Sequence, residues 1–141
     1  MYRHILVATD GSAFSSSAIR QGVALAKALN SRLTAIAVLA PYTPGNTAIS
    51  ALKGFAAAVR REARRSLAAF NAEARAQAVR ATTTSVVGGE PWKAILLAAR
   101  SRKCDLIVMA SHGRSGLAGV LLGSETTKVL THSTVPVLVC R

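Results

Sequence analysis

The chain is poor in aromatic residues and has no long apolar run. Only 4% of its 141 residues are aromatic although 50% are hydrophobic, so we expect a core of Ala, Val, Leu and Ile. No apolar run reaches the length of a membrane span, and the first residues enter a strand pattern with no leader. These absences argue against a membrane protein. They predict a soluble, cytoplasmic protein with one domain over residues 1–141.

Cysteine is scarce as well. Cys104 and Cys140 are the only two, one at the start of a strand pattern and one at the end of another. Their separation fits no metal-ligand spacing, which predicts reduced, structural thiols rather than a metal site.

Strand patterns and helix patterns alternate along the whole chain. The expected strands are 4–9, 33–39, 82–87, 106–110 and 135–140. The expected helices are 14–29, about 48–78, one that begins at Pro91 and one that begins near Ser124. This alternation predicts an α/β fold, an open five-stranded parallel sheet with helices on both faces.

A glycine-rich loop follows the fourth expected strand. Four glycines fall within eleven residues, from Gly113 to Gly123, and Ser124 then opens a helix as a hydroxyl cap. A loop without β-carbons, followed by helix amides, can cradle a phosphate, whereas the simpler alternative is an ordinary flexible loop. The lysine-bearing P-loop pattern and G-x-G-x-x-G are both absent, which excludes these two motifs.

Polar residues end the first and fourth expected strands, at Thr9-Asp10-Gly11 and at Ser111-His112. In an open parallel sheet, ligands bind beyond the carboxyl ends of strands, where the winding reverses. If the two strands are neighbours, the strand order is 3-2-1-4-5 and Asp10 faces the glycine loop. A carboxylate beside phosphates needs a cation between them, or it takes a ribose hydroxyl instead. Either alternative predicts a nucleotide.

The chain resembles the universal stress protein family in segments that span its length. These segments are H-I-L-V-A-T-D-G-S, G-G-E-P-W-K-A-I, D-L-I-V-M-A-S-H-G-R-S-G-L and L-L-G-S-E-T-T-K-V-L-T-H-S-T-V-P-V-L-V. The nucleotide-binding branch carries Gly, two residues, Gly, nine residues, Gly, then Ser or Thr. The matching positions are Ala110, Gly113, Gly123 and Ser124, so only the first departs from the signature.

The resemblance implies a Rossmann-like fold that binds ATP or another adenine nucleotide. We expect Mg²⁺ to accompany the nucleotide, with Asp10 as its protein ligand. The resemblance also implies that the Val38 backbone hydrogen-bonds adenine. The contacts that it implies for the rest of the ligand come from Ala8, Thr9, Asp10, Met109, Ala110, His112, Gly113, Arg114, Gly123, Ser124, Glu125 and Thr126.

Simpler roles compete with these assignments. Asp10 suits a turn before a helix in any protein, and Ser124 suits a helix cap as well as a phosphate ligand. His112 is expected to hydrogen-bond rather than act as a base. Ser111 has no partnered base and orienting acid, so it is not assigned as a nucleophile. For Arg114, an anion contact is favoured over a free surface position.

Basic residues outnumber acidic ones by eighteen to six, a formal net charge of +12 that is expected to attract acidic partners. The long second helix carries the densest cluster, with Arg60, Arg61, Arg64 and Arg65 on a solvent face. The simpler interpretation is a solvated helix. The functional one is a weak, salt-sensitive polyanion contact, without the aromatic platforms of single-strand binders.

The last expected strand, Val135–Cys140, would lie at a sheet edge. Exposed apolar edges invite association, so we expect a second copy of the chain to cover it. The family resemblance also implies this homodimer.

The sequence as a whole predicts an ATP-binding protein that acts as a stress-responsive binding or signalling module. One alternative is a slow ATPase or autophosphorylating protein, and another is a polyanion-binding protein without nucleotide. Phosphoryl transfer needs a positioned metal, a group that orients the nucleophile and charge clamps. The sequence offers only Asp10 and Arg114 as candidates for these roles, which favours ATP binding over ATP hydrolysis.

Overall fold

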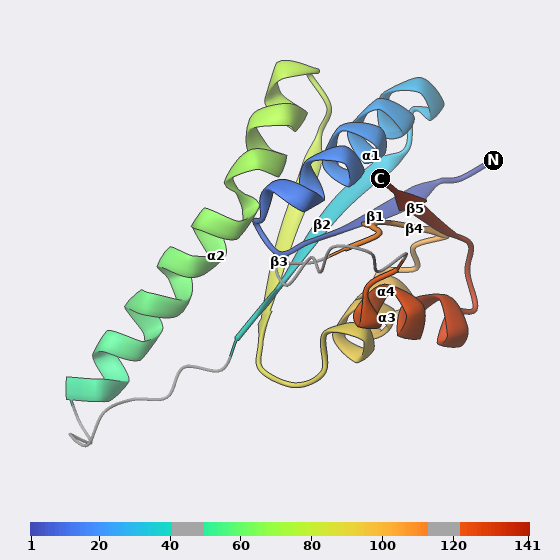
Figure 1. Cartoon of the computed structure of the whole chain (residues 1–141). Helices are drawn as coiled ribbons and strands as arrows, with labels where there is room; N and C mark the ends of the chain where they lie inside the picture. Colours follow the sequence, from blue (N-terminus) through green and yellow to red (C-terminus); the bar gives the residue numbers. More distant parts are fainter. Residues whose placement is uncertain (41–49, 113–121) are drawn as a thin grey trace.

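The protein contains a five-stranded parallel sheet in the order β3-β2-β1-β4-β5 (Figure 1). The computed structural model describes residues 1–40, 50–112 and 122–141. Its strands are β1 (His4–Thr9), β2 (Arg32–Leu39), β3 (Ala81–Val87), β4 (Leu106–Ala110) and β5 (Val137–Cys140). Its helices are α1 (Ser16–Leu29), α2 (Ser50–Ala76), α3 (Pro91–Ser101) and α4 (Ser124–His132), with a short 3-10 turn at Ala13–Ser15. The predicted fold class and strand order are confirmed.

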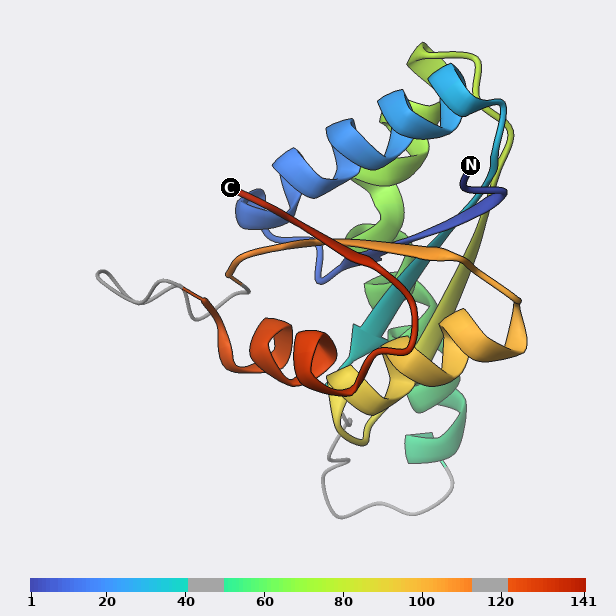
Figure 2. The same ribbon diagram turned by 90° about the vertical axis from the view of Figure 1, so that its right-hand side faces the viewer.

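The helices form a layer on each face of the sheet, with α1 and α2 on one side and α3 and α4 on the other (Figure 2). Alternate residues of a strand point to opposite faces. Val7 therefore packs in the cluster beneath α1 and α2, whereas Leu6 packs in the cluster beneath α3 and α4. All six residues of β1 are buried, as a central strand covered on both faces requires.

The core is mainly aliphatic, as the composition predicts, and Phe70 of α2 is its largest fully buried side chain. Close packing depends on small residues where α1 crosses the sheet. A β-carbon added to Gly22 would lie 2.4 Å from Val7 Cγ2, so α1 approaches β1 only because this position has no side chain. This contact fixes the helix that follows the carboxyl end of β1.

Several element boundaries differ from the sequence prediction by one or two residues, and the structure explains two of them. α1 begins at Ser16 rather than residue 14, because Ala13–Ser15 form the 3-10 turn. β5 begins at Val137 rather than Val135. Pro136 has no N–H to donate, although its carbonyl accepts the Ile107 N–H at 3.0 Å, so the strand proper starts after it.

Both cysteines are buried and free. Burial raises the pKa of Cys104 to about 11 and also raises the pKa of Cys140. Each thiol is therefore protonated at neutral pH, as structural rather than reactive cysteines are. Among the described residues, no helix combines the length and the apolar character needed to cross a bilayer.

Candidate functional site

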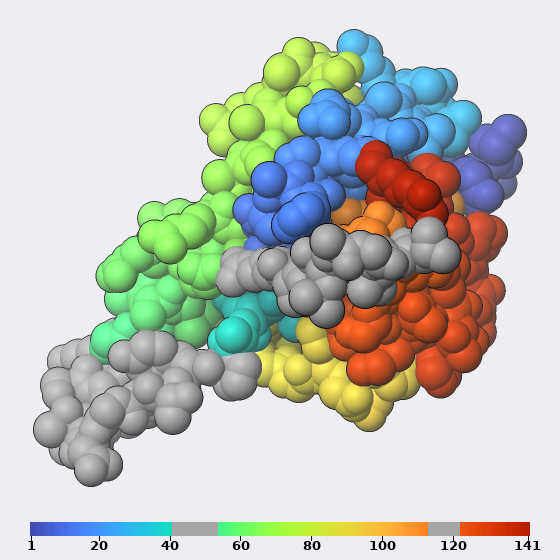
Figure 3. Space-filling model, viewed as in Figure 1, coloured from blue at the N-terminus to red at the C-terminus, as the bar shows by residue number. Residues whose placement is uncertain are grey.

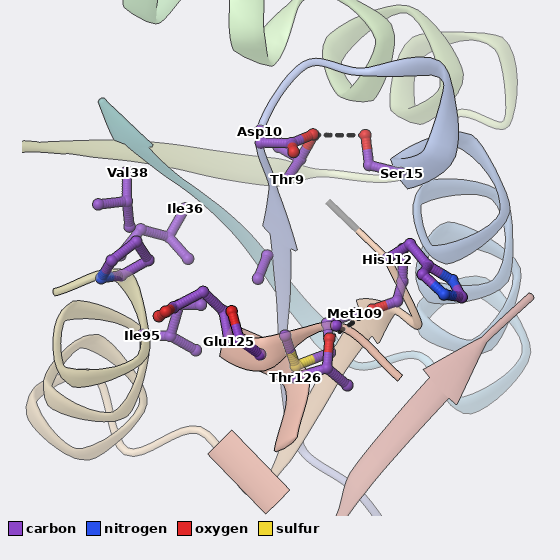
Figure 4. Close-up of a pocket in the computed structure, with 15 residues that line it drawn as sticks. Thr9, Asp10, Ser15, Ile36, Val38, Ile95, Met109, His112, Glu125 and Thr126 are labelled. Atoms are coloured by element: carbon purple, nitrogen blue, oxygen red, sulfur yellow. Dashed lines mark hydrogen bonds between the residues drawn. The ribbon is translucent and has the colours of Figure 1, made fainter. Parts of the chain in front are cut away.

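A cavity of about 290 Å³ opens at the carboxyl ends of the strands, on the side of α3 and α4 (Figure 4). The ends of β1, β2 and β4 and the first turns of α3 and α4 surround it. The predicted site residues that line it are Ala8, Thr9, Asp10, Val38, Met109, Ala110, His112, Gly123, Ser124, Glu125 and Thr126. Gly113 and Arg114 lie outside the described residues. The structure thus brings the eleven described candidates to one place.

Four further residues line the cavity without having been predicted: Ser15, Ile36, Pro91 and Ile95. Ile36 lies two positions before Val38 on β2, so both side chains point to the same face. Ile95 belongs to the buried stripe of α3. Both isoleucines look like ordinary core residues in the sequence, and only the strand period that links Ile36 to Val38 offered a signal.

The cavity has an apolar side and a polar side. Ile36, Val38 and Ile95 lie together at one end, whereas Thr9, Asp10 and Ser15 lie together at another (Figure 4). An apolar slot suits a flat ring system, and polar groups beside it suit hydroxyls or phosphates. This division is what a site for a nucleoside derivative needs.

The turn after β1 is held by a chain of hydrogen bonds. The Gly11 N–H donates to Thr9 Oγ1 at 3.1 Å, and Ser15 Oγ donates to the Ser12 carbonyl at 2.7 Å. Thr9 Oγ1 and Ser15 Oγ lie 2.9 Å apart. Because the Ser15 hydroxyl donates its single proton to the Ser12 carbonyl, the Thr9 hydroxyl must be the donor to Ser15 Oγ. Both hydroxyls therefore stabilise the turn that presents Asp10.

Asp10 forms an Asx turn at this place. Its Oδ1 accepts the Ser12 N–H at 2.9 Å and Ser12 Oγ–H at 2.6 Å. Gly11 has φ +76°, and a β-carbon there would lie 2.7 Å from the Ser66 Cα of α2. Only glycine satisfies both conditions. The simpler turn role predicted for Asp10 is thus present, at the rim of the cavity.

The start of α4 corrects one prediction. The N-cap residue is Gly123, not Ser124, and it makes no side-chain cap hydrogen bond. Ser124 is instead the first residue of the helix. The first amides of a helix have no intrahelical acceptors, and a glycine cap offers them no side-chain oxygen. This helix start therefore presents backbone donors and a positive dipole end to the cavity that Gly123 and Ser124 line.

Two hydrogen bonds fix α4 to the end of β4. The Gly123 N–H donates to the Ser111 carbonyl at 2.6 Å, and Thr126 Oγ1 donates to the Ala110 carbonyl at 2.9 Å. Thr126 is buried. Its hydroxyl proton is therefore already donated to the backbone. Thr126 lines the cavity, but its side chain does not donate a hydrogen bond to a ligand there.

Glu125 connects the two helices that wall the cavity. Its Oε2 accepts the Trp92 N–H of α3 at 2.9 Å, and its Oε1 accepts from Lys128 Nζ at 3.1 Å. The Trp92 ring also stacks on His132 of α4, with ring centroids 4.5 Å apart. Glu125 thus caps the first turn of α3 from the first turn of α4. The sequence predicted it as a ligand contact and gave no sign of this bridge.

His112 hydrogen-bonds its neighbour. Its Nδ1 lies 3.0 Å from Ser111 Oγ, and Ser111 is buried. In Figure 4, His112 lies on the side of the cavity away from Ile36 and Val38. The pair matches the hydrogen-bonding role predicted for this histidine.

The described residues contain no group of three or more His, Cys, Asp or Glu that could hold a metal ion. A cation at this site would therefore take most of its ligands from phosphates and water. The Asp10 carboxylate at the strand ends could supply a further ligand to the cation. Coordination by one carboxylate together with phosphates and water is typical of Mg²⁺.

Comparisons with known proteins agree on one family. The model of the universal stress protein family matches residues 1–141. A universal stress protein of Thermus aquaticus is 34% identical over 151 residues, and universal stress protein YxiE of Bacillus subtilis is 32% identical over 149 residues, each match covering 100% of both chains. Among solved structures, a universal stress protein in complex with cAMP matches with a TM-score of 0.71 at 28% identity, covering 99% of this chain and 97% of that one.

Proposed function

The chain belongs to the universal stress protein family, and from this premise we propose that it binds an adenine nucleotide, ATP with Mg²⁺, and acts as a stress-responsive binding or signalling module. One observation carries the proposal. The ends of β1 and β4 and the amide-bearing start of α4 border a single cavity whose other end is apolar. The structural relative that carries cAMP adds support from outside the chain.

The apolar end and the polar end of the cavity suit different parts of the ligand. Adenine lies in the apolar end against Ile36, Val38 and Ile95, with the Val38 backbone as its hydrogen-bond partner. The ribose lies near Ala8 and Asp10. The phosphates approach the first turn of α4, where backbone N–H groups stabilise negative charge without a side chain.

Mg²⁺ belongs with the phosphates in this proposal. Asp10 would supply the protein's carboxylate ligand to the ion, and phosphates and water would supply the other ligands. The ion supplies charge neutralisation, which offsets the repulsion between Asp10 and a triphosphate.

Titration calorimetry of the whole chain with ATP, ADP, AMP and cAMP, with and without Mg²⁺, tests the proposal. We expect binding heat for adenine nucleotides and a loss of at least tenfold in affinity for Ala8→Leu, because the added side chain fills the cavity floor. The matched control is Ala28→Leu on the exposed side of α1, which should bind like the wild type. Absence of heat with every adenine nucleotide at millimolar concentration would contradict the proposal.

A slow ATPase is the rival function for the same cavity. Hydrolysis requires a group that orients the attacking water. Asp10 is the acid at the strand ends, and its Oδ1 already accepts two hydrogen bonds from Ser12, which favours a role in the turn. We therefore expect no phosphate release above background. Turnover that Asp10→Ala abolishes would establish the enzyme instead.

We also propose a homodimer formed through β5 and a cytoplasmic location. The edge position of β5 supports the dimer. Two buried free thiols fit a reducing compartment. Fractionation of cells that express the tagged chain tests the location, and recovery outside the cytoplasmic fraction would contradict it.

A further inference from the structure

The outer side of α2 carries a stripe of exposed arginines, unrelated to the cavity. The stripe consists of Arg60, Arg61, Arg64, Arg65 and Arg75. The opposite side of the helix buries Leu67 and Phe70 against the sheet. In the space-filling view, α2 forms one flank of the molecule (Figure 3). At about 1.5 Å per residue, the stripe extends for about 22 Å along the helix axis.

Little negative charge offsets the stripe. Glu62 Oε2 lies 3.8 Å from Arg65 Nη1, and the Arg65 side chain is 75% exposed. An ion pair this long and this open to water is weak. Arg64 Nε donates to the Arg60 carbonyl at 3.4 Å, which leaves its charge in place. The stripe therefore adds a local positive field to a chain whose net charge is +12.

The residues between the arginines indicate what kind of polyanion fits. From 54 to 76, every exposed residue of α2 is Gly, Ala or Arg. A helix that lies on a membrane needs large apolar side chains to insert, and a single-strand binder needs aromatic rings on which bases stack. The described exposed residues of α2 include neither kind. The exposed face of α2 therefore consists of small residues and arginines, whose guanidinium groups can bind phosphates.

We propose that this arginine stripe docks α2 on the phosphate backbone of double-stranded DNA, without sequence specificity. The major groove of B-DNA is about 12 Å wide and admits an α-helix. Small alanines between the arginines let the helix approach the groove while guanidiniums reach the phosphates on its rims. The major groove of duplex RNA is too deep and narrow for the same approach.

Fluorescence anisotropy of the whole chain with a labelled 20-base-pair DNA duplex tests the proposal over a range of salt concentrations. The test variant replaces Arg60, Arg61, Arg64 and Arg65 by Gln. The matched control replaces Arg3, Arg20, Arg100 and Arg102 by Gln, all of them exposed and outside α2. Both variants lower the net charge by the same amount, so only the position of the lost charge differs.

We expect the α2 variant to lose at least tenfold in affinity at low salt and the control to lose less than threefold. Because each phosphate contact contributes about −0.9 to the slope of log K against log salt, the slope should become shallower by about 3 to 4 in the α2 variant only. Replacing Arg60, Arg61, Arg64 and Arg65 by Lys should keep most of the binding, and thermal melting verifies that each variant is folded.

Three results would overturn the proposal. One is an equal loss in both variants, which would mean that only the overall charge matters. Another is binding to vesicles of anionic phospholipid in place of the duplex. The third is a duplex RNA that binds as tightly as the DNA, which would contradict the groove argument. Occupancy of the nucleotide cavity affects none of these comparisons.

Discussion

Ala110 lines the cavity and also packs in the core beneath α1. Ala110 packs in the same cluster as Val108, whereas Met109 between them packs on the other face. The position where the nucleotide-binding signature has glycine thus borders the cavity at a strand end, with its side chain directed to the opposite face. A methyl group so placed does not crowd a ligand.

Ala110→Gly should therefore leave nucleotide affinity within about twofold of the wild type. It should lower the free energy of unfolding by about 1 to 2 kcal/mol, because a buried methyl is lost and the strand gains backbone freedom. Calorimetry and urea denaturation measure the two effects. A large gain in affinity would show that the methyl does obstruct the site.

His4 carries a pH-dependent contribution to stability. Its Nδ1–H donates to the Arg102 carbonyl at 3.0 Å, and its Nε2 accepts from Thr34 Oγ1 at 2.8 Å. Burial lowers the pKa of His4 below its usual 6.5. The folded protein therefore keeps a neutral ring where the unfolded chain takes up a proton.

We predict that the free energy of unfolding falls as the pH drops below about 6.5, by at most about 1.4 kcal/mol per pH unit from this group. Above that pH, His4 does not change the free energy of unfolding with pH. Denaturation between pH 7.5 and 5 checks this, with His4→Gln as the reference that lacks the titration. Parallel pH profiles for wild type and variant would contradict the assignment.

The bridge from α4 to α3 rests on one side chain, Glu125. Glu125→Ala would leave the Trp92 N–H and Lys128 without this acceptor, at a cost of about 1 kcal/mol, similar to the loss of a helix cap. Glu125→Gln keeps an oxygen acceptor and should cost less. Glu62→Ala, which removes a long surface ion pair with Arg65, should cost less than Glu125→Ala.

Chemical denaturation gives these free energies, and hydrogen exchange at the Trp92 amide reports the bridge directly. Exchange should accelerate in Glu125→Ala and stay near the wild-type rate in Glu62→Ala. Equal protection of the Trp92 amide in both variants would mean that Glu125 does not hold α3.

Periodicity predicted the helices and strands because the sheet is covered on both faces and its inner strands read as continuous apolar runs. The residues that cap the helix starts were harder to predict from the sequence. Ser15 is the N-cap residue of α1, yet its hydroxyl donates to Ser12 and makes no capping hydrogen bond, and Ser124 follows a glycine cap. A cap depends on the entry angle of the chain, which tertiary packing sets and residue type does not.

The polar ends of β1 and β4 led to the strand order 3-2-1-4-5 on the condition that the two strands are neighbours, and the sheet meets this condition. Parallel strands deliver their ends to one edge, which is why the candidate site was expected there. The apolar end of the cavity was not predictable. Ile36 and Ile95 have core residue types at core spacing, and only the packing of α3 on β2 makes them line a cavity. The Glu125–Trp92 contact joins residues 33 positions apart and left no pattern in the sequence.

β5 is an edge strand of the sheet, and its free edge is where we propose that two molecules associate. Among the described strands, β5 pairs with β4 alone. The Pro136 carbonyl accepts the Ile107 N–H of β4, and the Cys140 carbonyl accepts the N–H of Ser111, the residue after β4. Because backbone groups alternate sides along a strand, the N–H and C=O groups of Val137 and Val139 point outward. A second copy related by a two-fold axis would pair with this edge antiparallel and satisfy them.

Val139→Pro removes one outward N–H and leaves the ladder to β4 intact, since the groups that face β4 belong to its neighbours. We predict that the wild type is a dimer by light scattering at micromolar concentration and that Val139→Pro is a folded monomer. Val139→Thr keeps the amide and the β-branched shape, so it should remain a dimer. Circular dichroism verifies the fold of each variant. A dimer that survives the proline would place the interface elsewhere, because edge pairing cannot proceed with the donor missing and the ring in its place.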